Sequence, residues 1–230
     1  MSDLIKFANS AVADVSAIDA QLDKALAKAP AVNSGQPYLK ISQKTGKWVF
    51  GAEGTQVEDD SQWAVNPGSL MHGYVCWSDP KVTKKKAELL GEIMVPAPED
   101  LPPSSSLDDH SADGGIWKDA VGFDLACVSG EDEGEQVVFN SSSGGGCKAY
   151  RDVLQAIRNR PEPDYFVPIV TLGETNYVSN YGETVYNPVF KVVGWANATG
   201  ERMDGDIADA GADEQPEETE NPPRRRRRSA

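Results

Sequence analysis

Apolar and polar residues alternate in short runs between residues 38 and 195, as they do in half-buried β-strands. The run YLKISQKTGKWVFG at 38–51 predicts a hairpin, with Gly46 in its turn where a positive φ is needed. Because Gly, Pro and Asp separate the runs, the pattern favours an antiparallel barrel or sandwich over alternating strand–helix units. Further strands are predicted at 62–65, 70–77, 88–96, 120–129, 135–141, 165–173 and 188–195.

One segment within this β-rich region has the period of a helix. In GGGCKAYRDVLQAIRNRP, Tyr150, Val153 and Ile157 fall on one face, which predicts a helix over about 147–159. The preceding glycines are expected to form a flexible connection, and Pro161 ends the helix. The expected fold is therefore mainly β with one intervening helix.

Two segments outside the strand pattern have a different character. Residues 97–115 are polar and rich in Pro and Ser, which predicts a long flexible surface loop. Residues 1–33 carry apolar residues at helical spacing and a helix-stopping proline near their end. They predict either an amphipathic helix docked on the core or on a partner, or a partly disordered segment. The apolar positions are Leu4, Ile5, Ala8, Val12, Val15, Ile18, Leu22 and Leu26.

These patterns divide the chain into three parts. Residues 1–36 are predicted to be a helical or flexible extension, and 37–197 a β-rich core domain. Residues 198–230 have no periodicity and too few apolar residues to fold, so a disordered tail is expected, acidic first and then arginine-rich.

Charge narrows the range of partners. The formal net charge is −14, and residues 1–200 alone carry −11, so the acidity belongs to the body as well as to the tail. Such a charge opposes casual binding to phosphate backbones but leaves room for a local basic groove. The first residues lack a basic region followed by an apolar core, and no run approaches the ~20 apolar residues of a membrane span. We therefore expect an intracellular protein without membrane contact.

The sequence gives little support for catalysis, a cofactor or a metal site. His72 lies in a predicted strand and His110 in the polar loop, and no established catalytic or phosphate-loop motif is present. The acids at 131–135 lack calcium-loop spacing, and the three cysteines form no C-x-x-C pair. We expect a non-enzyme with reduced structural cysteines and without a cofactor or a bound metal.

Aromatic and basic residues gather in three places and predict a surface for single-stranded nucleic acid. Bases stack on aromatic rings while lysines follow the phosphates. The 38–50 hairpin, the lysine loop at 81–86 and the tyrosine-rich hairpin at 177–186 supply both kinds, although the tryptophans are equally compatible with core positions. The predicted binding residues are Tyr38, Lys40, Lys44, Lys47, Trp48, Tyr74, Trp77, Lys81, Lys84, Lys85, Lys86, Tyr177, Tyr181, Tyr186, Arg224, Arg225, Arg226, Arg227 and Arg228.

The terminal arginines are expected to modulate binding, because nine acids lie in the same segment of residues 201–230. A tethered arginine run makes salt-sensitive phosphate contacts without sequence information. It can equally fold back on the acidic body, and this alternative stays open.

Four motifs carry a resemblance to a known family: SQWAVNPGSLMHGYVCW, LGEIMVP, FDLACVSGEDEGEQVVFNSSSGG and YGETVYNPVFKVVGWAN. They resemble a family of small early proteins of tailed bacteriophages, encoded among DNA-replication and recombination genes. The resemblance covers about residues 37–197 and implies an OB-like barrel that binds single-stranded DNA in the cytoplasm of the bacterial host. It implies no active-site residue.

The leading hypothesis is therefore a phage single-stranded DNA-binding protein, expected as a homo-oligomer, whose acidic tail contacts replication or recombination proteins. One alternative is an adaptor or inhibitor of a host nucleic-acid enzyme, whose acidic surface imitates DNA. Another is a virion component whose arginines touch the packaged genome.

Overall fold

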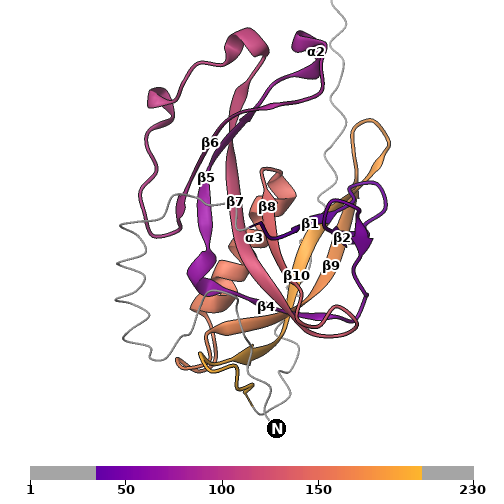
Figure 1. The fold of residues 1–230 in the computed structure, drawn as a ribbon, viewed down its shortest axis with the longest axis vertical. Helices are drawn as coiled ribbons and strands as arrows, with labels where there is room; N and C mark the ends of the chain where they lie inside the picture. The colour runs from indigo at the N-terminus through magenta and orange to yellow at the C-terminus, as the bar shows by residue number, and fades with distance from the viewer. Residues whose placement is uncertain (1–34, 204–230) are drawn as a thin grey trace, which may run out of the picture.

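The computed structural model describes residues 35–203, which form a mainly β domain with one long helix (Figure 1). The predicted fold class is thus confirmed. The predictions for the N-terminal extension, the acidic segment and the arginine run lie outside the described residues. No described helix is long and apolar enough to cross a membrane. The strands are β1 (Tyr38–Ile41), β2 (Trp48–Phe50), β3 (Thr55–Gln56), β4 (Gln62–Val65), β5 (Met71–Trp77), β6 (Leu89–Pro96), β7 (Ile116–Ser129), β8 (Gln136–Ser141), β9 (Val167–Val178) and β10 (Thr184–Ala196); the helices are α2 (Pro80–Thr83) and α3 (Gly144–Arg158), with 3-10 turns η1 (Pro67–Ser69), η2 (Ser104–Ser106) and η3 (Ser111–Asp113).

All ten described strands belong to one sheet, in the order β10-β9-β4-β7-β8-β1-β2-β3, with β5 and β6 added alongside β7. The pairings between these strands are antiparallel except for β1 and β8, which run parallel. The 14-residue β7 organises the sheet, because β5 pairs with its first half and β4 with its second half. Consequently β4 and β5 act as one strand that is interrupted at η1.

An arm projects from the body of the sheet and consists of β5, β6 and residues 116–122 of β7 (Figure 1). α2 lies at its far end, in the connection from β5 to β6. The loop at 97–115 is fastened to the arm, because Asp108 O accepts a 2.9 Å hydrogen bond from Trp117 Nε1. The His110 ring also lies 5.7 Å from the Trp117 ring. One face of the arm is therefore covered by this loop.

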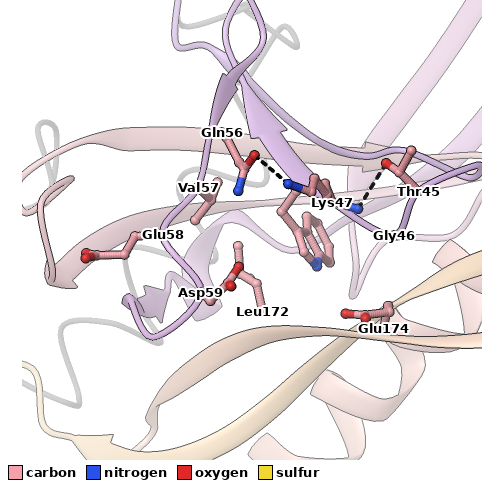
Figure 2. Close-up of a pocket in the computed structure, with 10 residues that line it drawn as sticks. Thr45, Gly46, Lys47, Gln56, Val57, Glu58, Asp59, Leu172 and Glu174 are labelled. Atoms are coloured by element: carbon pink, nitrogen blue, oxygen red, sulfur yellow. Dashed lines mark hydrogen bonds between the residues drawn. The ribbon is translucent and has the colours of Figure 1, made fainter.

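The two ends of the sheet approach each other at the β1–β2 turn (Figure 2). Tyr186 N of β10 donates a 3.0 Å hydrogen bond to Gln43 O, and Trp48 Nε1 donates a 3.0 Å bond to Gly173 O of β9. Gly46 has a φ of 71°, as the hairpin predicted, and a Cβ there would come within 2.8 Å of the Tyr186 ring. No strand pairing joins β10 to β1 in residues 35–203, so the sheet is curled but open.

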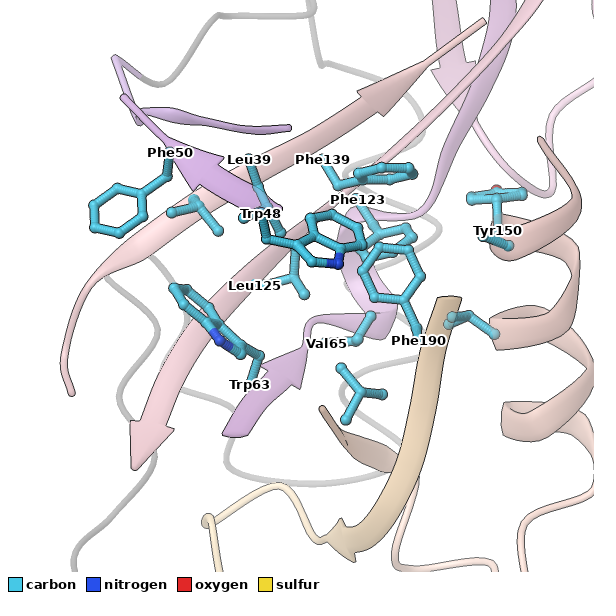
Figure 3. Packing of buried hydrophobic residues seen from close by; sticks show 14 of the residues in the cluster. Leu39, Trp48, Phe50, Trp63, Val65, Phe123, Leu125, Phe139, Tyr150 and Phe190 are labelled. Carbon is cyan, nitrogen blue, oxygen red and sulfur yellow. The ribbon is translucent and has the colours of Figure 1, made fainter. Parts of the chain in front are cut away.

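The core lies inside this curl and is rich in aromatic residues (Figure 3). The Phe123 ring centre is 5.3 Å from that of Phe139 and 5.0 Å from that of Phe190. Tyr150 reaches this cluster from α3, stacking 6.1 Å from Phe123. Trp48 and Trp63 complete it, each almost fully buried. Because β7, β8, β10 and α3 all contribute, the helix closes one side of the core.

The predicted helix is confirmed, but it begins at Gly144, earlier than the expected start near 147. Ser143 caps it, because its hydroxyl accepts a 3.0 Å hydrogen bond from Gly146 N. The glycines form its first turn instead of a flexible connection. They permit close packing, since a Cβ on Gly145 would overlap the Asn187 side chain and one on Gly146 would overlap Ser141.

The carboxyl group of Asp124, on β7, is largely buried, and this burial makes the stability of the domain depend on pH. Burial raises the pKa of Asp124 to about 6, whereas an unfolded chain titrates near 3.9. Between about pH 4 and 6 the folded state thus binds a proton that the unfolded state lacks, and stability falls as the pH rises through this window. We expect Asp124→Asn to raise the free energy of unfolding by about 2 kcal/mol at pH 7 and by little at pH 4.

Urea unfolding at both pH values measures this effect. The exposed Asp119, also on β7, provides the matched control, because Asp119→Asn should change stability by less than about 0.5 kcal/mol. An equal gain for Asp124→Asn at pH 4 and pH 7 would contradict the assignment to ionisation.

Candidate nucleic-acid interface

A groove of about 320 Å³ separates the arm from β1 and β8, and it brings together three of the predicted binding residues. Tyr38 and Lys40 line it from β1, and Trp77 lines it from β5. These residues are distant in sequence and meet because β1 pairs with β8, which lies next to β7 and hence next to the arm. The remaining lining residues are Val75, Leu89, Glu92, Met94, Ala120, Val121, Asn140, Ser141 and Ser142.

The arm carries an exposed apolar row on the face that borders this groove, and two of its three residues, Trp77 and Leu89, line the groove. Trp77 lies directly opposite Leu89 on β6 and Ile116 on β7, so the three side chains share one face of the sheet. Their exposed fractions are 48%, 47% and 71%, respectively, which is unusual for large apolar side chains in a row. We call these three residues the apolar row. Within this row, Trp77 offers an aromatic face on which a base can stack.

Tyr74 does not join the apolar row, which corrects the prediction that grouped it with Trp77. Residues three apart on a strand point to opposite faces. Tyr74 pairs with Asp119 and shares its face with Trp117, where the 97–115 loop packs. The alternation along β5 was visible in the sequence and could have separated the two aromatic residues.

On the opposite wall, Tyr38 and Lys40 alternate along β1 and therefore share a face. Lys40 Nζ lies 5.7 Å from the centre of the Tyr38 ring, within the range of a cation–π contact. This combination places a positive charge beside an aromatic face, as the sequence predicted for the first hairpin. A phosphate and its base can engage these two groups together.

Further positive charge surrounds the arm. Lys81, Lys84, Lys85 and Lys86 are exposed at its far end, as predicted for a lysine loop. Lys84 has a φ of 58° and ends α2, which turns the chain sharply and keeps the loop compact.

Lys118 is a candidate that the sequence prediction missed. It pairs with Val75 across the strands, so it lies on the groove face of the arm, and it is exposed. Its position two residues from both Ile116 and Ala120 was the available signal, because period-two alternation puts all three on one face. Without the pairing of β7 with β5, however, the sequence could not show which face lines a groove.

Three predicted residues lie away from the groove. Trp48 is 5% exposed and packs against Phe139 and Phe190, so it offers no free face to a base (Figure 3). Lys47 Nζ donates to Gln56 Oε1 at 3.1 Å and lines a second pocket, of about 380 Å³ (Figure 2). The neighbouring Lys44 is exposed on the same turn.

This second pocket is a poor site for phosphate. Glu58, Asp59 and Glu174 line it together with a single lysine, Lys47 (Figure 2). Three carboxylates against one ammonium group repel an anionic backbone. The β1–β2 hairpin therefore contributes Tyr38 and Lys40 of β1 to the candidate interface, but not Lys44, Lys47 or Trp48.

Of the three predicted tyrosines of the β9–β10 hairpin, two are exposed near its tip and one is packed against the β1–β2 turn. Tyr177 and Tyr181 are exposed near its tip, Tyr181 at 94%. Tyr186 pairs with Asn176 and packs on Gly46, so it belongs to the contact between the two ends of the open sheet and not to the tip. Arg224–Arg228, also predicted to bind, lie outside the described residues.

Other polar groups have structural partners. His72 Nε2 lies 2.8 Å from Glu99 O, and burial raises the pKa of Cys127 to about 11, which keeps that thiol protonated. Within residues 35–203, no cluster of His, Cys, Asp and Glu could hold a metal ion.

Comparisons with protein-family models, curated proteins and solved structures find no match for this chain. Function is therefore inferred from the chemistry of the groove.

Proposed function

We propose that the protein binds single-stranded DNA in the groove, without sequence preference, and supports phage replication or recombination in the cytoplasm of the bacterial host. The observation that carries the proposal is the meeting of Tyr38, Lys40 and Trp77 on the facing walls of one groove. Two aromatic faces and a lysine are the elements that single strands require. Leu89 and Ile116 add exposed apolar surface beside Trp77 on the arm.

The connectivity of the sheet supports an OB-like reading of this site. An OB-fold has five strands and binds oligonucleotides across its second and third strands, between the 1–2 and 4–5 loops. If β4 and β5 count as the first strand, β7, β8, β9 and β10 follow as the second to fifth. The segment between β5 and β7, which contains α2, β6 and the 97–115 loop, then corresponds to the 1–2 connection, and the tip with Tyr177 and Tyr181 corresponds to the 4–5 loop. β1 is added beside the third strand, where Tyr38 and Lys40 extend the same surface.

The distribution of charge supports binding on one face of the arm. The 97–115 loop on the opposite face has five acidic residues and no lysine or arginine. The groove side has Lys40 and Lys118 with one acid, Glu92, and the lysine loop lies at its far end. The acidic surroundings repel a strand that lies elsewhere and leave the groove as the favourable path.

A salt-titrated binding assay tests the proposal. Fluorescein-labelled oligo(dT) should show a large rise in anisotropy with the full chain, and a duplex of equal length should bind at least about tenfold more weakly. If three to five lysines neutralise phosphates, log K should fall against log[salt] with a slope of about −2 to −3.5. Absence of binding at low salt, or equal affinity for the duplex, would refute the proposal.

Replacing Lys118 by Gln should reduce that slope by about 0.7, because one phosphate contact is lost. Lys44→Gln removes the same charge from the β1–β2 turn, away from the groove, and should leave the slope unchanged. The same anisotropy titrations measure both variants. Equal slopes for the two variants would remove Lys118 from the interface.

The second candidate function is an adaptor or inhibitor of a host nucleic-acid enzyme. The acidic second pocket favours it, since Glu58, Asp59 and Glu174 suit a basic partner better than DNA. This function predicts no response to oligo(dT) at any salt concentration. A virion component, the third alternative, would copurify with phage particles.

A further inference from the structure

We propose that two copies of this chain associate through the outer edge of β6, which forms an antiparallel pair with β6 of the second copy. β6 pairs with β5 alone, so no strand of residues 35–203 lies along its other edge. An exposed, mainly apolar edge strand is a template for pairing with another chain. The association concerns the protein without DNA and is independent of the proposed function.

The sequence of β6 suits a covered edge better than a free one. Its eight residues, LLGEIMVP, contain one charged side chain, Glu92, and no lysine. Edge strands that stay free commonly carry lysines, prolines or bulges. In β6 the register irregularity lies next to Leu89 and the proline is Pro96, so both features are at the ends of the strand. Residues 91–95 between them form a regular, mainly apolar edge.

The hydrogen bonds to β5 show which backbone groups of β6 point outward. Ala97 N donates a 2.8 Å bond to Leu70 O, one residue beyond the paired strands and in the same register. Opposite residues of an antiparallel pair alternate between bonded and non-bonded positions. The N–H and C=O groups of Glu92 and Met94 therefore point away from β5. No other backbone hydrogen bond engages these groups in the described part of the chain.

Symmetry and side-chain chemistry select one register for this pair. Outward groups must face outward groups, so a two-fold axis near the middle of β6 passes through residue 92, 93 or 94. An axis at Glu92 would set two carboxylates directly opposite each other. An axis at Met94 would set Glu92 opposite Pro96, which has no N–H to donate. An axis at Ile93 avoids both costs, because Glu92 then exchanges two hydrogen bonds with Met94 of the second copy, and the symmetric pair does the same.

This register also brings the grooves of the two copies together. Glu92 and Met94 line the groove, and opposite residues of an antiparallel pair share a face. The two arms then form one continuous sheet with both grooves on the same face. If the proposed function holds, one long single strand can follow both grooves, and the dimer should bind it more tightly than a monomer does.

Charge changes at the paired positions test the register without DNA. Sedimentation of the full chain should show a monomer–dimer equilibrium. Met94→Glu places a carboxylate opposite Glu92 of the second copy and should raise the dimer dissociation constant about 2- to 30-fold, because two symmetric like-charge pairs form. Combining it with Glu92→Lys turns both into opposite-charge pairs and should restore dimerisation. Ile116→Glu adds the same charge to the apolar row, away from the edge, and should have no effect.

A disulfide tests the position of the axis. Ile93 and Ile93 of the second copy would form a non-bonded pair with Cα atoms about 4.5 Å apart, within the range of a disulfide. Ile93→Cys should therefore give a disulfide-linked dimer under mild oxidation, in higher yield than the native cysteines give. Ile116→Cys is the control, because Ile116 is more exposed and lies on the same arm but not on its edge.

Four results would overturn the inference. They are a monomer at every concentration, a dimer that Met94→Glu leaves intact, a loss of dimer that Glu92→Lys does not reverse, and equal disulfide yields from Ile93→Cys and Ile116→Cys. If the dimer forms in this register and oligo(dT) does not bind, the proposed function alone fails.

Discussion

Replacing Trp77 by alanine should weaken binding of single-stranded oligo(dT) by about 5- to 150-fold, the largest effect expected from any exposed side chain of the domain. The loss of one stacked base costs about 1–3 kcal/mol, which corresponds to that range. Because the substitution removes no charge, the salt dependence should keep its slope. Trp77 is 48% exposed, so the free energy of unfolding should change little. Anisotropy titrations at several salt concentrations and urea unfolding measure these quantities.

Tyr74→Ala is the matched control, because Tyr74 lies on the same strand and faces the covered side of the arm. It should leave affinity nearly unchanged. Trp77→Phe should retain most of the binding, since a smaller aromatic face still stacks. If Tyr74→Ala weakened binding more than Trp77→Ala, the strand would have to bind the opposite face of the arm.

Gly73→Ala should lower the free energy of unfolding by about 3 kcal/mol, because the arm has no room for a side chain at this position. Gly73 is buried in β5 between β6 and β7, and a Cβ there would overlap the Ile93 carbonyl oxygen of β6. Because the obstructing atom belongs to the backbone, it cannot move away by a change of rotamer. The added Cβ must therefore push β6 away and weaken its pairing with β5. Urea unfolding measures the loss. The arm forms one wall of the groove, and DNA affinity should fall as well.

Gly173→Ala provides the comparison within the same sheet. Gly173 lies in β9 next to β10, and a Cβ there would meet its nearest neighbours at 3.9 Å, an ordinary contact. The substitution should change stability by less than about 1 kcal/mol. Similar losses at both glycines would show that the cost is a general property of strand glycines and not of the crowded Ile93 carbonyl.

Local sequence patterns predict the type and approximate position of most secondary-structure elements of this domain. The predicted strand at 62–65 matches β4, and the runs at 70–77, 88–96 and 135–141 lie within one residue of β5, β6 and β8, because alternation and turn residues act locally. β7, β9 and β10 are longer than predicted. Their outer residues include the exposed Val178, whose strand conformation comes from pairing with Thr184 and not from burial.

The composition of the groove depends on pairings that local patterns do not contain. The alternation of Trp48 and Phe50 shows that they share a face, but the curl of the sheet decides that this face is inside. Likewise, Ile116 joins Trp77 only because β7 pairs with β5 over its first half. The sequence could therefore identify residues of the right chemistry, while the long-range pairing decides which of them meet.

The parallel pairing of β1 with β8 has a consequence for the order of folding. Tyr38 pairs with Val138, so about 100 residues must be synthesised after β1 before its partner exists. At about 5–20 residues per second, the first hairpin waits on the order of 5–20 s on the ribosome with Leu39, Trp48 and Phe50 lacking their core neighbours. β1, the first strand of the described residues, is thus among the last to reach its place, and this long loop closure should slow folding. During that interval the hairpin is a natural substrate for a chaperone.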